Sequence, residues 1–140
     1  MYLYISGPFF NDEEIANVEY VESVLDEKGY TYFSPMRHSV GGEVGSQEWA
    51  EKIFEMDRDE IMKADAMVTL YYGNYSDTGT AWECGYATAM GIPVILVHVD
   101  EANDANLMLH CGSTTNIYLK DLADYDFETL PEYPYEGDML

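Results

Sequence analysis

Two carboxylates lie close together in the run DTGTAWE, which spans residues 77–83 and follows an apolar segment. The pattern predicts that Asp77 lies in a loop and that Glu83 lies about one turn into a helix. Two carboxylates beside one cleft suit a retaining glycosyl transfer, in which one attacks the anomeric carbon and the other handles the proton of the leaving group. The dipole of the helix N-terminus would favour the charged form of Glu83. The same spacing also fits a simpler interpretation, in which Asp77 only caps the helix and Glu83 is a solvated surface residue.

Further side chains could join these carboxylates. Asp57 lies on one stripe of a predicted helix, with isoleucines four residues before and after it. An acid on an apolar face is either a buried hydrogen-bonding partner or a site residue. Tyr4, Gly7 and Phe10 lie around the end of the first predicted strand. The ring of Phe10 could stack on a planar base, or it could pack in the core. Gly7 and Gly79 would let backbone and substrate approach closely.

The charge of the chain limits its partners. The 140 residues include 6 Lys and Arg against 27 Asp and Glu, which gives a formal net charge of −21. Such a surface would repel nucleic acid and anionic membranes, and it offers few cations for a substrate with several phosphates. We therefore expect a neutral small-molecule ligand and no nucleic acid or membrane partner. The alternative is that the charge serves only solubility.

Other features of the sequence indicate the class of protein. The length fits one ordinary domain over residues 1–140. The two cysteines form no CxxC pair and have no histidine at zinc-ligand spacing, so we expect a reduced, cytoplasmic protein without a metal site. We also expect neither a secretion signal nor a membrane-spanning segment, because the apolar runs are short.

Strand and helix signals alternate along the chain. Predicted strands span 1–5, 30–33, 66–72, 93–98 and 116–119, and predicted helices span 12–28, 47–64, 79–90 and 102–110. Asn11 is the predicted N-cap of the first helix, with Glu14 as its capping-box partner. The alternation predicts an α/β fold, a flavodoxin-like doubly wound five-stranded parallel sheet with helices on both faces. Ligands bind at the carboxyl ends of such strands, which selects the loops 6–11, 35–46, 72–79 and 98–106.

Four short motifs carry a resemblance to a known family. They are YLYISGPFFN at 2–11, DTGTAWE at 77–83, NLM at 106–108 and YEG at 135–137. DTGTAWE and NLM together are the motifs that are specific to the family. With these motifs the sequence resembles the nucleoside 2-deoxyribosyltransferases along almost its whole length.

The resemblance implies a role for each matching residue. Glu83 matches the nucleophile that forms a deoxyribosyl-enzyme intermediate, and Asp77 matches the acid that helps to protonate the base. Asp57 matches a carboxylate of the site near the base, and Tyr4 matches the residue that orients the nucleophile. Asn106 matches a residue that a neighbouring subunit lends to the region around the 5′-hydroxyl of the sugar.

The resemblance also implies partners and a reaction. The substrates would be purine and pyrimidine 2′-deoxynucleosides and free nucleobases, exchanged in nucleoside salvage without a metal or organic cofactor. The family forms homo-oligomers built from dimers, often hexamers, in which the C-terminal carboxylate, here that of Leu140, reaches an adjacent site. The residues expected to bind substrate are Gly7, Phe10, Gly79, Asn106 and Met108.

One departure from the family affects base recognition. Family members often carry a glutamine in the loop after the second strand, whereas this loop reads PMRHS at 35–39. The roles of Arg37 and His38 stay open, and so does the preference between purines and pyrimidines.

Two alternatives compete with deoxyribosyl transfer. A 2′-deoxynucleoside 5′-monophosphate N-glycosidase would share the fold and the carboxylate, but it would need phosphate-binding groups near the sugar. The scarcity of Lys and Arg argues against it, although backbone amides and serines could serve. The other alternative is a non-catalytic nucleotide-binding module. The NLM motif and the C-terminal tail favour the transferase.

Overall fold

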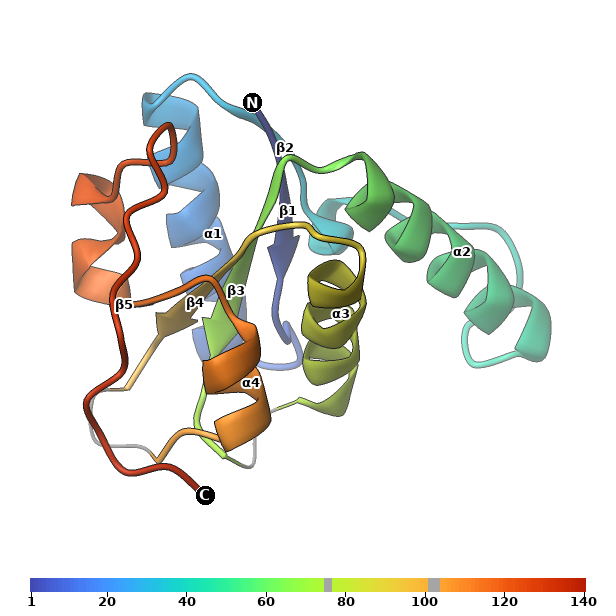
Figure 1. The fold of residues 1–140 in the computed structure, drawn as a ribbon. Coiled ribbons are helices and arrows are strands. Elements are labelled where there is room, and N and C mark those ends of the chain that lie inside the picture. Colours follow the sequence, from blue (N-terminus) through green and yellow to red (C-terminus); the bar gives the residue numbers. More distant parts are fainter. Residues whose placement is uncertain (75–76, 101–103) are drawn as a thin grey trace.

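The computed structural model describes residues 1–74, 77–100 and 104–140. Five strands form one parallel sheet in the order β2-β1-β3-β4-β5 (Figure 1). They are β1 (Tyr2–Ser6), β2 (Thr31–Phe33), β3 (Ala66–Tyr71), β4 (Val94–His98) and β5 (Thr115–Tyr118). The predicted doubly wound sheet is confirmed, and its strand order changes direction between β1 and β3. The carboxyl ends of these two strands flank the position where such folds bind ligands.

Helices connect the strands in the described part of the chain. They are α1 (Asp12–Glu27), the 3-10 helix η1 (Pro35–Arg37), α2 (Gln47–Lys63), α3 (Thr78–Ala89), α4 (Leu107–Gly112) and the 3-10 helix η2 (Leu119–Asp124). Asn11 is the N-cap of α1 as predicted, because its Oδ1 atom accepts from the Glu14 amide at 2.9 Å. The return contact differs from a capping box, since Glu14 accepts from the Phe10 amide at 3.0 Å and from the Asn11 side chain at 2.7 Å. The prediction for 102–110 is wrong at its start, since α4 begins at Leu107. Residues 102 and 103 lie outside the described residues.

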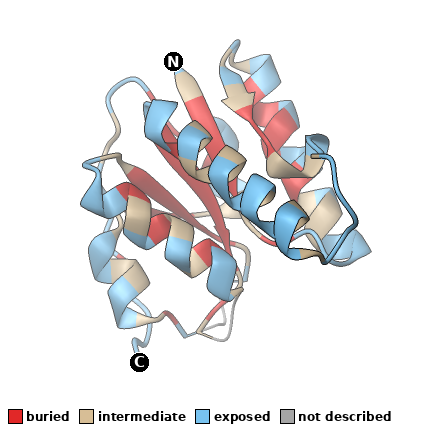
Figure 2. Cartoon of the chain, turned by 90° about the vertical axis from the view of Figure 1, so that its right-hand side faces the viewer, coloured by how far each residue is buried: buried red, intermediate tan, exposed pale blue. Residues whose placement is uncertain are grey.

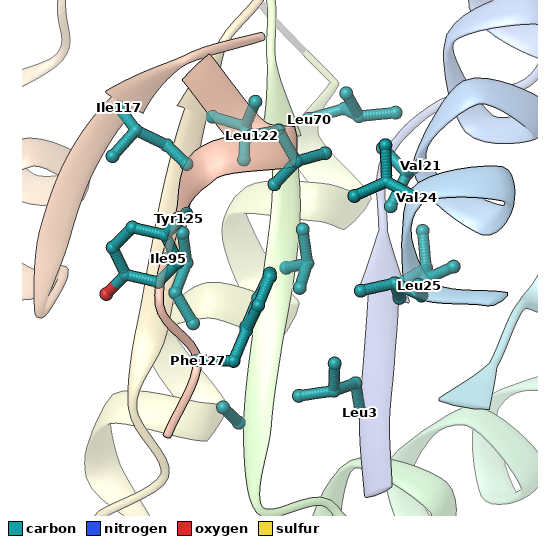
Figure 3. Packing of buried hydrophobic residues seen from close by; sticks show 14 of the residues in the cluster. Leu3, Val21, Val24, Leu25, Leu70, Ile95, Ile117, Leu122, Tyr125 and Phe127 are labelled. Atoms are coloured by element: carbon teal, nitrogen blue, oxygen red, sulfur yellow. The ribbon is translucent and has the colours of Figure 1, made fainter. Parts of the chain in front are cut away.

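One face of the sheet is covered by α1 and by the chain that follows β5. The apolar stripe of α1 includes Val21 and Leu25, both fully buried against the strands. Leu122 of η2 and Phe127 fill the rest of this face (Figure 3). This large apolar layer fixes the sheet without contributing to the chemistry at its edge.

The other face is covered by α2, α3 and α4. Cys84 and Ala87 of α3 and Ile61 of α2 pack on Tyr4 and Met67 of the strands. Most of α2 stands away from the sheet (Figure 1). Ile61 is the one buried residue of this helix, and its remaining residues are exposed or half-buried (Figure 2). Two cavities lie between α2, α3 and the loops at the carboxyl ends of the strands.

The C-terminal tail has no periodicity but is tied to the body. Tyr135 stacks on the buried ring of His98, with centroids 4.6 Å apart. Near the end, Ala105 and Met139 form an isolated parallel bridge. The tail thus returns to the segment that precedes α4. None of the helices in the described ranges has the length and apolar character to cross a bilayer.

Candidate active site

Glu83 reaches from α3 to the end of strand β1. The hydroxyl of Tyr4 donates a hydrogen bond to Glu83 Oε1 at 2.9 Å, and the hydroxyl of Ser6 donates to Glu83 Oε2. Both donors are fully buried in the sheet. Glu83 is therefore not a solvated helix residue, and each of its carboxylate oxygens is held by a donor from the strand next to the switch point.

The pKa of Glu83 is raised to about 7, mainly by burial and to a smaller extent by the negative charges of Asp57 and Asp77. The hydrogen bonds from Ser6 and Tyr4 act in the opposite direction, because they favour the charged form. A carboxyl group with this pKa is partly ionised at neutral pH. Its ionised form can attack as a nucleophile, and the same carboxylate is stable enough to leave again in a second displacement.

Asp57 projects from α2 toward the same space. Its Oδ1 atom is buried and has no hydrogen-bond partner among the described residues. Burial raises the pKa of Asp57 to about 6. Between the two interpretations of an acid on an apolar face, the geometry thus favours a site residue, since the group is not satisfied by the protein itself.

Asp77 is the N-cap of α3, as the simpler interpretation of the sequence expected. Its Oδ2 atom accepts from the amide and the hydroxyl of Thr80, each at 2.8 Å. Gly79 follows closely, and a Cβ atom there would lie 3.2 Å from the same oxygen. Capping and a role in the site are compatible, because the residue also lines the cavity that contains Glu83.

A cavity of about 370 Å³ opens at the carboxyl ends of β1 and β2; we call it the Glu83 cavity. Its walls include Pro8, Met36, His38 and Trp49. The predicted site residues that line it are Gly7, Phe10, Asp57, Asp77, Gly79 and Glu83. Tyr4 contacts the site through Glu83. The apolar and aromatic walls and the carboxyl groups together suit a small, flat, uncharged ligand.

A second cavity of about 420 Å³ lies between α2 and α3 and shares Asp57 and Glu83 with the first. Exposed aromatic rings border it, and Phe54 and Trp82 meet edge to face with centroids 5.3 Å apart. The two carboxyl groups are thus accessible from both sides of the gap between the helices.

Asn106 and Met108 do not lie in the Glu83 cavity of the same chain. They line a separate cavity of about 610 Å³ between α3 and α4, which Asp77 also borders. Asn106 Oδ1 caps α4 by accepting from the amide of Met108, a residue that is 74% exposed. The terminal Leu140 flanks Asn106, since it donates to Ala105 O and accepts from the Leu107 amide, both at 2.9 Å.

The two basic residues of the loop after β2, Arg37 and His38, have different surroundings. Arg37 forms an ion pair with the buried carboxylate of Glu22 at 2.6 Å, so it stabilises the fold. His38 stacks on Phe33, with centroids 4.2 Å apart, and lines the Glu83 cavity. His38 thus lies in the loop after β2, where family members often carry a glutamine and where the sequence predicts no residue that contacts the base.

Sequence reasoning missed Ser6, which contacts Glu83 directly. The available signal was a small hydroxyl residue at the end of a strand, directly before Gly-Pro. In the described ranges, no group of three or more His, Cys, Asp or Glu residues could hold a metal ion.

Comparisons with known proteins support the family assignment. The family model described as nucleoside 2-deoxyribosyltransferase matches residues 3–123. The solved 2-deoxyribosyltransferase from Bacillus psychrosaccharolyticus is 37% identical with a TM-score of 0.89, and the match covers 96% of this chain and 99% of that one. The 2-deoxyribosyltransferase from Leishmania mexicana is 26% identical with a TM-score of 0.58, over 81% of this chain and 73% of that one.

A third solved structure is similar in fold alone. It is a CMP N-glycosidase from Clostridium botulinum, 22% identical with a TM-score of 0.62, over 89% of this chain and 96% of that one. The comparison with curated protein sequences found no match. The family model and the Bacillus structure each cover most of the sequence, and they agree. The chain belongs to the nucleoside 2-deoxyribosyltransferase family and is an enzyme of this kind.

Proposed function

We propose that the enzyme moves a 2-deoxyribosyl group from a 2′-deoxynucleoside to a free nucleobase, through a covalent intermediate on Glu83. One observation carries this proposal. The carboxylate of Glu83 lines a cavity that suits a small, flat, uncharged ligand such as a nucleoside. Its two oxygens accept hydrogen bonds from the buried hydroxyl groups of Tyr4 and Ser6. A fixed and partly desolvated carboxylate is the group that a retaining double displacement requires.

The reaction proceeds in two displacements at C1′ of the sugar. A Glu83 oxygen forms a bond to C1′ while the bond between C1′ and the base nitrogen breaks, and that electron pair leaves with the base. A proton delivered to the base neutralises the leaving group. A second base then attacks C1′ and releases the Glu83 carboxylate. Two inversions give net retention, and both transition states are oxocarbenium-like.

The proton for the leaving base has two candidate sources. Asp77 caps α3 through its Oδ2 atom, and we assign contact with the ligand to its Oδ1 atom. A buried oxygen of Asp57 has no hydrogen-bond partner in the described part of the chain, and its pKa of about 6 leaves part of it protonated near neutral pH. We assign contact with the base to both carboxyl groups and give Asp57 the proton transfer, because a raised pKa suits a general acid.

The cavity supports nucleosides more than nucleotides as substrates. Among the described residues that line the Glu83 cavity, none is Lys or Arg. A 5′-phosphate in this cavity would meet the carboxylates of Glu83 and Asp77 without a Lys or Arg side chain in the described lining. For this reason we place the alternative, hydrolysis of 2′-deoxynucleoside 5′-monophosphates, second.

A site shared between subunits is part of the proposal. Asn106, Met108 and Leu140 cluster together, but they lie outside the Glu83 cavity of their own chain. The exposed Met108 is available to a neighbouring copy. In a homo-oligomer built from dimers, the α4 start of one subunit would complete the Glu83 cavity of the next.

Mixing two inactive variants tests this sharing. Glu83→Gln and Asn106→Ala subunits are combined after dissociation and reassembly. If the site is shared in a symmetric dimer, mixed dimers contain one site with neither substitution, and equal mixing restores about one quarter of the activity. If each site belongs to one chain, mixing restores none.

Turnover itself is tested with 2′-deoxyinosine and adenine, followed by chromatography. We expect 2′-deoxyadenosine and hypoxanthine from the native enzyme, and no product from Glu83→Gln. Glu55→Gln on exposed α2 serves as the matched control and should be fully active. Free deoxyribose in place of 2′-deoxyadenosine, or release of base only from 2′-deoxynucleoside monophosphates, would instead establish a hydrolase.

A further inference from the structure

The hydroxyl of Ser6 is the second donor to the carboxylate of Glu83. Tyr4 holds Oε1 and Ser6 holds Oε2, so the carboxylate is fixed at both oxygens. Ser6 is fully buried as the last residue of β1, and it lines neither of the two cavities that contain Glu83. Its contact with the site therefore passes through Glu83 alone.

We propose that Ser6 is a positioning residue for the nucleophile, which fixes the second oxygen of Glu83 and keeps the carboxylate charged in an acidic, buried site. The inference rests on the proposed function, in which Glu83 attacks C1′. Ser6 keeps its proton throughout the reaction. When one Glu83 oxygen bonds to C1′, the other becomes the carbonyl oxygen of the ester, and its hydroxyl donor remains in place. On the return step the same donor stabilises the carboxylate that leaves.

The surroundings of Glu83 explain why a second donor matters. The groups that face it on the packed elements are Tyr4 on β1, Asp57 and Arg58 on α2, His38 after η1, Asp77 before α3 and Cys84 on α3. The two nearby acids oppose its ionisation, as does burial. Arg58 is engaged with Asp59 at 2.9 Å. The hydroxyl groups are thus the contacts that favour the charge on Glu83.

The sheet holds Ser6 in a fixed position. In the strand register Ser6 pairs with Thr69 of β3. The Thr69 hydroxyl lies 3.3 Å from the thiol of Cys84, the residue next to Glu83. Two neighbouring buried hydroxyls thus contact two consecutive residues of α3, but only the Ser6 hydroxyl touches the carboxylate. Thr69 therefore provides a control of matched burial.

The test compares pH profiles of Ser6→Ala and Thr69→Val. Loss of one hydrogen bond to a carboxylate raises the pKa of that group by about one unit. For Ser6→Ala we expect the acidic limb of kcat to move up by about one pH unit, with roughly fivefold lower kcat at pH 7, recovery above pH 9 and little change in KM. Thr69→Val should keep the limb of the native enzyme, and Ser6→Thr should restore it. A Ser6→Ala limb that coincides with that of the native enzyme would refute the inference.

A second measurement separates this inference from the proposed function. The titration of Glu83 is followed by NMR in protein carrying ¹³C-labelled glutamate, with the Glu83 signal assigned by its loss in Glu83→Gln. We expect its pKa to be higher in Ser6→Ala than in the native protein and in Thr69→Val, with or without turnover. An unchanged Glu83 titration in Ser6→Ala overturns the role of Ser6. Full activity of Glu83→Gln overturns the proposed function instead.

Discussion

Replacement of Asp57 by Asn should make the protein more stable and less active. One oxygen of the Asp57 carboxyl is buried and has no hydrogen-bond partner among the residues that the structure describes, and burial raises the pKa of Asp57 to about 6. The folded protein therefore binds this proton more tightly than the unfolded chain does. Its charged form costs folding free energy at neutral pH, and an uncharged amide of the same shape avoids that cost.

The size and the pH dependence of the stability gained in Asp57→Asn follow from the shift in the pKa of Asp57. A rise from 3.8 to about 6 corresponds to about 3 kcal/mol, and partial solvent access to the carboxyl reduces this to about 1–2 kcal/mol. The cost is absent below pH 3.8, where Asp57 is protonated in both states, and it is complete above pH 6. The gain from Asp57→Asn should thus be about half as large at pH 5 as at pH 8.

The assay is urea unfolding at several pH values, read from tryptophan fluorescence at one protein concentration. Asp59→Asn, on the exposed side of the same helix, is the control and should change the free energy of unfolding by less than about 0.5 kcal/mol. Transfer activity of Asp57→Asn should fall about 100-fold, because the amide cannot deliver the proton. If Asp57→Asn is no more stable than the native protein at pH 8, the reasoning about its burial is refuted.

Two further substitutions test the support of the nucleophile. Tyr4→Phe removes the donor to Glu83 Oε1, so kcat should fall about 10-fold at pH 7 and its acidic limb should move to higher pH; an unchanged pH profile would contradict the role of Tyr4. Gly7→Ala places a Cβ atom 3.0 Å from Leu70 Cβ at a φ of +154°, so thermal unfolding should show a loss of about 1–3 kcal/mol, and a native-like melting temperature would contradict the close approach.

The sequence predicted the elements that position the site because their signals are local. The cap Asp77, Gly79 two residues later and Glu83 lie within one short segment, and α3 begins where this segment indicates. The apolar strands likewise predict a parallel sheet without knowledge of their partners. These features depend on residues that are neighbours in the chain.

The contacts of Glu83 could not be derived in the same way. Its donors, Tyr4 and Ser6, precede it by 79 and 77 residues, so their meeting depends on the strand order. The family resemblance predicted the contact of Tyr4 with Glu83, and no feature of the sequence predicted that of Ser6. Spacing alone also left open whether Asp57 was satisfied by the protein, because that depends on what the neighbouring loops offer.

One predicted boundary is wrong and one segment carried no structural prediction, because distant partners decide the structure of both. The segment before α4 pairs with the tail through Ala105 and Met139, so the helix starts later than its composition suggests. The tail lacks periodicity, yet Phe127 is fully buried and Tyr135 covers His98. Aromatic side chains anchor an irregular segment here, and no repeat in the sequence signals such packing.

The central claim is that Glu83 carries the sugar during transfer. The most direct test incubates the enzyme, without an acceptor base, with a 2′-deoxynucleoside that bears a 2′-fluorine. The fluorine disfavours positive charge at C1′ and should slow release of the covalent intermediate. Intact-protein and peptide mass spectrometry should then show one fluorinated deoxyribosyl group per chain, located on Glu83 and absent from Glu83→Gln. An enzyme that exchanges bases on natural substrates but shows no adduct, or shows it on another residue, would contradict the account.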